Sequence, residues 1–122
     1  MPVEIGQELI EFHKKKSNLT DEQGQFMLRI IKLVYQVFPN LDNLNRMFNC
    51  CTVLAQGIDV TTPYGMRSFY FKTPTTAYYY QYQRGRENDF HREEPKEFSL
   101  FTDKEILTNL KRKQFPREKV LK

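Results

Sequence analysis

The 122-residue chain lacks a long apolar run, a disulfide framework and tryptophan. No stretch approaches the roughly 20 consecutive apolar residues of a membrane-spanning helix. The first residues carry no basic segment followed by an apolar one, so we expect neither a secretory signal nor a membrane partner. The two cysteines, Cys50 and Cys51, are adjacent. This arrangement excludes a disulfide framework and predicts buried thiols in an intracellular, reducing compartment, cytoplasmic or nuclear.

Sequence motifs for catalysis, phosphate binding or metal binding are also scarce. The sequence has no glycine-rich phosphate loop and no nucleophile motif, and His13 and His91 lie too far from the cysteines and from each other for a structural zinc site. Glu87, Asp89, His91 and Glu93 alternate, and on an extended segment they could hold a divalent cation. A charged, solvated turn explains the same run more simply. We therefore predict no catalytic residue, metal ligand or cofactor, and keep a metal-dependent enzyme as the lesser alternative.

The composition is that of a globular protein, with 39% hydrophobic, 28% charged and 14% aromatic residues. The length predicts a single domain over residues 1–122, with a frayed basic tail at 116–122. The net charge of +4 is unevenly spread. Residues 1–60 carry six cations and seven anions, so the remainder holds +5. An excess of this kind is consistent with an anionic partner or with ordinary solvated surface.

The first half of the chain predicts three helices. Residues 3–16 form an amphipathic segment that ends in a lysine run, which suits the negative end of a helix dipole. Thr20 and Gln23 have the spacing of a capping box, and apolar residues then recur at helical spacing up to Pro39. A third helix is predicted from residue 41, with Gly57 as its C-terminal stop. The members of its apolar face are Leu41, Leu44, Met47, Phe48, Cys51 and Leu54.

From Ile58 the apolar period changes to two, which indicates strands. Reversals at residues 62–65 and 73–76 predict a three-stranded meander, a charged linker follows at 84–95, and residues 96–101 predict a fourth strand. Thr102 then begins a C-terminal helix with the capping pattern of the second one. The fold class is therefore α+β: three N-terminal helices, an antiparallel sheet of three or four strands, and a C-terminal helix.

Even-length reversals assign the two faces of this meander. The helix-facing side would hold Ile58, Val60, Arg67, Phe69, Phe71, Tyr78, Tyr80 and Tyr82. The other side would place Tyr70 directly opposite Tyr79, with Lys72 and Gln81 diagonal to them. An odd loop would exchange the faces of one strand, because side chains alternate along a strand.

The stretch from Tyr64 to Arg86 holds eight aromatic residues and four cations with no acid. Exposed aromatic rings stack bases, and nearby cations neutralise phosphates, so this stretch predicts binding of single-stranded DNA or RNA by a non-enzymatic protein. No RNP motif or GXXG loop accompanies it. The predicted binding residues are Tyr70, Tyr79, Lys72, Gln81, Arg84, Arg86, Lys111, Arg112 and Lys113. The alternative is a protein-protein interface, including a homodimer, on the same tyrosine-rich sheet.

Overall fold

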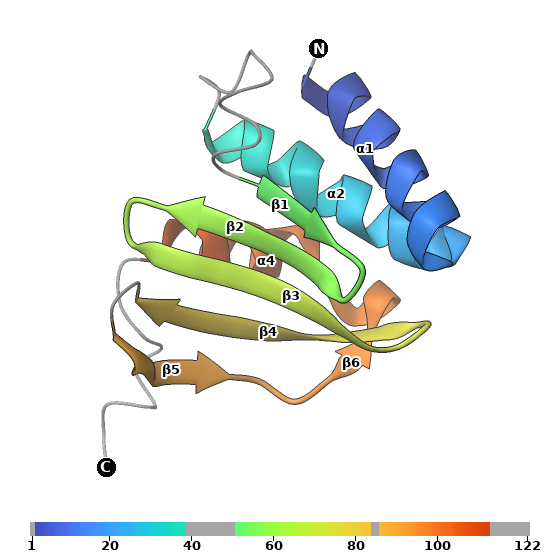
Figure 1. Ribbon diagram of the computed structural model, residues 1–122. Helices are drawn as coiled ribbons and strands as arrows, with labels where there is room; N and C mark the ends of the chain where they lie inside the picture. Colours follow the sequence, from blue (N-terminus) through green and yellow to red (C-terminus); the bar gives the residue numbers. More distant parts are fainter. Residues whose placement is uncertain (1, 39–50, 84–85, 113–122) are drawn as a thin grey trace.

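The computed structural model describes residues 2–38, 51–83 and 86–112, which form three α-helices and a six-stranded antiparallel sheet (Figure 1). The helices are α1 (Pro2–Ser17), α2 (Asp21–Val37) and α4 (Asp103–Lys111). The strands are β1 (Cys51–Leu54), β2 (Gly57–Thr62), β3 (Gly65–Thr73), β4 (Thr76–Gln83), β5 (Arg86–Arg92) and β6 (Lys96–Glu97), and the 3-10 helix η1 (Phe98–Leu100) follows β6. The predicted α+β class is confirmed, with more strands than expected.

Side-chain capping begins α2 and α4 at the predicted residues. The Thr20 side chain accepts a hydrogen bond from the Gln23 backbone at 3.1 Å, and the Gln23 side chain accepts one from the Thr20 backbone at 2.8 Å. This reciprocal pair satisfies N–H groups that a helix start otherwise leaves unpaired. Thr102 likewise accepts from the Glu105 backbone, although the Glu105 carboxylate binds Lys96 rather than returning to the cap. Both predicted helix starts are thereby confirmed.

The predicted third helix is wrong at its C-terminal end, where strand β1 stands. Its earlier residues, 39–50, lie outside the described residues. Cys51 and Val53 are buried while Thr52 between them is exposed, and this alternation is that of a strand with one face on the core. Gly57, which we expected to stop the helix, is the first residue of β2 and has φ of 148°.

Strands β1 to β5 lie side by side in chain order, each antiparallel to the next. Both β5 and β6 pair with β4: β6 pairs with its first two residues and β5 with its later ones. The segment 84–95, predicted as a linker, therefore contains a strand. The strand predicted at 96–101 is confirmed only at Lys96–Glu97, because η1 follows at once.

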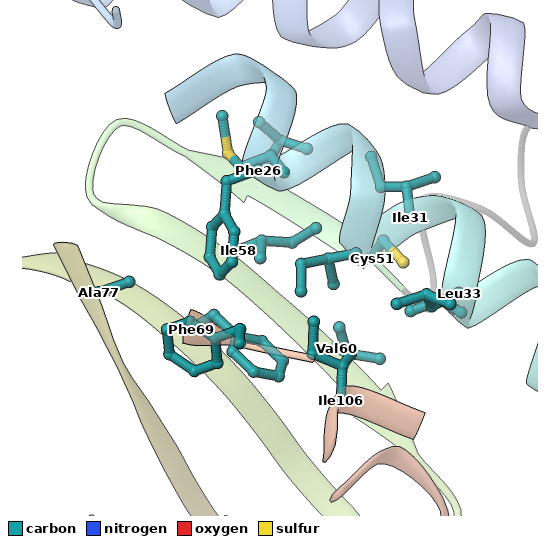
Figure 2. Close-up of a cluster of buried hydrophobic side chains, with 14 of the residues drawn as sticks. Phe26, Ile31, Leu33, Cys51, Ile58, Val60, Phe69, Ala77 and Ile106 are labelled. Atoms are coloured by element: carbon teal, nitrogen blue, oxygen red, sulfur yellow. The ribbon is translucent and has the colours of Figure 1, made fainter. Parts of the chain in front are cut away.

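The helices α2 and α4 cover one face of the sheet, and α1 packs along α2 (Figure 1). Figure 2 shows the core between these layers, where Phe26, Ile31 and Leu33 of α2 lie over side chains of the sheet. The Phe26 ring is central, since it stacks on Phe98 at 4.5 Å and meets the edge of Phe69 at 6.2 Å between ring centroids. Burial of this apolar surface is the main force that holds the helices to the sheet.

A β-bulge in β3 sets the register of the central hairpin. Phe71 pairs with Ala77 and Thr73 pairs with Thr76, so Lys72 has no partner in β4. One extra residue on one strand shifts every later pairing by one position.

The bulge makes the predicted pairing of Tyr70 with Tyr79 wrong. The two-residue turn at 74–75 would give that pairing in a regular ladder, but the extra residue pairs Tyr70 with Tyr78. The β2 and β3 residues predicted to face the helices do so, whereas the faces of β4 are exchanged. Tyr78, Tyr80 and Tyr82 consequently lie on the helix-free side.

Candidate binding surface on the open face of the sheet

Six side chains on the face of the sheet that α2 and α4 leave free form what we call the open aromatic face. Three cross-strand pairs define it: Tyr70 with Tyr78, Tyr80 with Arg92, and Tyr82 with Phe90. Strands β4 and β5 contribute residues at every second position, so their side chains share one side, and Tyr70 of β3 joins them through its pairing with Tyr78. No helix among the described residues packs on this side (Figure 1).

The rings of this face are in mutual contact. Tyr80 is central, with centroid distances of 6.1 Å to Tyr70, 5.4 Å to Tyr82 and 5.4 Å to Phe90. The guanidinium of Arg92 lies 4.8 Å from the Tyr78 ring centroid, a cation–π distance. Phe90 is 51% exposed, and the four tyrosines are half-buried. The surface therefore combines accessible aromatic area with one exposed cation.

Tyr70 is held in place by its surroundings. Its hydroxyl donates to Asp59 Oδ1 at 2.5 Å, and Ser68 Oγ donates to the same oxygen at 2.8 Å. A Cβ on Gly57 would lie 3.0 Å from Tyr70 Cδ1, so glycine gives the ring its room over β2. Burial, and next the bond to Asp59, raise the pKa of the Tyr70 hydroxyl. A ring fixed in this way is a preorganised contact.

The structure places two predicted binding residues in the core instead. Tyr79 is 1% exposed and Gln81 is 2% exposed, and the Tyr79 hydroxyl donates to Gln81 Oε1 at 2.6 Å. Burial raises the pKa of the Tyr79 hydroxyl. The expectation that these two side chains face a ligand is corrected by the register shift at the bulge, which turns them toward the helices.

Among the predicted cations, Lys72 is the exposed, unpaired residue of the bulge in β3, two positions after Tyr70. Lys111 and Arg112 belong to the end of α4, on the helix-covered side of the sheet (Figure 1). Arg112 also donates to Asn109 Oδ1 at 3.0 Å. These two therefore do not join the tyrosines. Arg84, Lys113 and the side chain of Arg86 lie outside the described part, so their role stays a prediction.

A row of polar side chains crosses the buried face. Arg67, Gln81 and His91 pair across β3, β4 and β5, and each is 3% exposed or less. Arg67 donates to four backbone carbonyls, among them those of Asn109 at 3.3 Å and of Arg112. Burial lowers the pKa of Arg67. Because the carbonyls of Asn109 and Arg112 stand at the negative end of α4, Arg67 anchors that helix to β3.

Of the alternating acidic run around His91, the structure describes the side chains of His91 and Glu93. His91 is buried, and its Nε2 lies 3.0 Å from Glu93 Oε2. The side chains of Glu87 and Asp89 are outside the described part. The residues that the structure describes contain no group of three or more His, Cys, Asp or Glu side chains placed to hold a metal ion.

The sequence interpretation missed Phe90 and Arg92 as members of the surface and assigned Tyr78, Tyr80 and Tyr82 to the wrong face. Phe90 and Arg92 flank His91 in a highly charged segment, where a single apolar residue gives no alternation that could indicate a strand. No described helix has the length and apolar character needed to cross a bilayer. Comparisons with protein-family models, curated proteins and solved structures find no match to the chain.

Proposed function

We propose that the chain is a non-enzymatic protein that binds single-stranded nucleic acid through the open aromatic face. The observation that supports this most is the contact of Tyr70, Tyr80, Tyr82 and Phe90 on a helix-free sheet, with Arg92 beside them. Bases stack on such rings with about 1–3 kcal/mol per base. A duplex already uses the faces of its bases in its own stack, so a single strand is the better ligand.

The charges near the face fit a short path for phosphates. Arg92 and Lys72 are exposed, whereas Arg67 is buried and bonded to carbonyls, which removes it from any such path. Each neutralised phosphate of a single strand contributes a slope of about −0.7 in log affinity against log salt. Two cations therefore predict a slope of roughly −1.4 and a moderate affinity.

The test compares two exposed phenylalanines. Phe90 belongs to the open aromatic face at 51% exposure, and Phe12 lies on α1 at 56% exposure. The Phe90→Ala change should weaken binding of a labelled single-stranded oligonucleotide about 5- to 150-fold, because it removes one stacking ring. The Phe12→Ala change removes a similar exposed ring and should leave affinity unchanged. Equal effects of the two changes, measured by fluorescence anisotropy, would contradict the proposal.

A homodimer through the same face is the second candidate. The exposed Phe90 and the few cations among the described residues of the face favour it, since interfaces are rich in aromatic residues and poor in charge. In that case the molar mass from light scattering should rise with protein concentration, and Phe90→Ala should lower it. Arg92→Gln should then have little effect, whereas it should weaken binding of nucleic acid.

A further inference from the structure

Asp59 places a carboxylate on the helix-free side of the sheet, and its two oxygens have different surroundings. Asp59 lies in β2, where it pairs with Ser68 of β3 on one side and with Thr52 of β1 on the other. Its Oδ1 accepts hydrogen bonds from Ser68 and Tyr70. Among the described residues Oδ2 has no hydrogen-bond donor, although the side chain is only half-buried. Within the part of the chain that the structure describes, Oδ2 is therefore an acceptor without a donor, on the carboxylate that the Tyr70 hydroxyl binds through Oδ1.

A carboxylate at a surface that binds nucleic acid repels the phosphates of the ligand. A hydrogen bond from a donor group of the ligand to the carboxylate would offset this repulsion. The donors on a base are its ring N–H and exocyclic amino groups, and a carboxylate accepts from the amino group of cytosine. Guanine and adenine also carry an amino group. Uracil and thymine offer one N–H between two carbonyl oxygens, and those oxygens repel a carboxylate.

We infer that Asp59 Oδ2 accepts a hydrogen bond from the exocyclic amino group of a base stacked on Tyr70. The surface then selects cytosine, adenine or guanine over uracil and thymine. This inference rests on the proposed function. It follows from the position of the Tyr70 hydroxyl, 2.5 Å from Oδ1, because a base that overlaps the phenol ring brings its edge to the carboxylate beyond it. The contacts of Oδ1 keep the carboxylate in one orientation.

The Asp59→Asn change tests this with little change of shape. The asparagine oxygen can still accept from Ser68 and Tyr70, and an NH₂ group then takes the place of Oδ2. An acceptor is thereby exchanged for a donor at one atom. Asp21→Asn is the matched control, because it removes the same charge from a residue that is exposed at the start of α2.

The experiment measures the affinity of wild type and both variants for oligocytidine and oligouridine of equal length. The wild type should bind oligocytidine about 10- to 150-fold more tightly, the range expected for one hydrogen bond to a charged group. Asp59→Asn should abolish or invert this ratio, and Asp21→Asn should keep it. Equal binding of the two oligomers by the wild type would overturn the inference and leave the proposed function standing. If the wild type binds neither oligomer, both the inference and the proposed function are wrong.

A chemical control keeps the inference testable if Asp59→Asn does not fold. Oligocytidine methylated twice at each N4 has no amino hydrogen, so the wild type should bind it as weakly as oligouridine. Binding as tight as that of unmodified oligocytidine would contradict a hydrogen bond to Asp59.

Discussion

Replacing Tyr79 with alanine should destabilise the protein far more than the same replacement of its neighbour Tyr80. Tyr79 is 1% exposed, its ring lies 5.3 Å from that of Phe69, and its hydroxyl bonds Gln81. Truncation of a fully buried aromatic side chain costs about 3–5 kcal/mol of the free energy of unfolding. The lost partner of Gln81 adds roughly 1 kcal/mol. Tyr80 is half-buried on the other face, so its truncation should cost about 1 kcal/mol.

Urea denaturation of the two variants beside the wild type gives both free energies. Tyr79→Phe is an informative third variant, because it keeps the ring and removes only the bond to Gln81, for a loss of roughly 1 kcal/mol. A regular hairpin without the bulge would reverse the order of Tyr79 and Tyr80. Equal losses, or a larger loss for Tyr80→Ala, would therefore refute the register on which the open aromatic face depends.

Three further predictions concern residues of the sheet. Gly57→Ala should lower the free energy of unfolding by at least about 2 kcal/mol in urea, because φ is 148° and the new Cβ would lie 2.2 Å from the Phe69 carbonyl oxygen; an unchanged midpoint would contradict this geometry. Deletion of Lys72, the unpaired residue of the bulge, keeps the pairing of Phe71 with Ala77 and should cost less than about 1 kcal/mol; loss of folding would show that the bulge itself is required. Burial raises the pKa of Tyr79 and Tyr70 in the folded state, while the unfolded chain ionises them near about pH 10. The unfolded state then binds fewer protons, so stability should fall as pH rises above about 10, and less steeply in Tyr79→Phe.

The elements with strong local signals could be predicted from the sequence. The capping box at Thr20 and the cap at Thr102 fix helix starts through contacts three residues apart, which a sequence pattern contains directly. The hairpin of β3 and β4 likewise follows from aromatic and β-branched runs around a turn at Pro74.

The predictions were wrong at β1 and β5, where pairing with another strand determines the local structure. The apolar spacing near Cys51 suits a helix as well as a short strand, and pairing with β2 selects the strand. The composition of the charged segment that contains β5 does not favour a strand. Its pairing with β4 makes it one.

For the open aromatic face, the unpaired Lys72 of the bulge made the predicted faces of β4 wrong. Composition identified the tyrosine-rich hairpin, but the assignment of its two faces depended on a regular ladder through Lys72. A bulge has no reliable sequence signature at such a position, and a shift of one residue exchanges every side chain of a strand. Tyr70 was placed correctly because it precedes the bulge on the strand whose register β2 fixes.

The most direct test of the proposed function is a titration of the wild-type protein with a mixed-sequence single-stranded RNA, followed by tyrosine emission. The chain has seven tyrosines and no tryptophan, so stacking on the open aromatic face should quench the dominant signal. Affinity should fall about sevenfold between roughly 50 and 200 mM salt if two phosphates are neutralised. An unchanged emission at both salt concentrations would contradict the account.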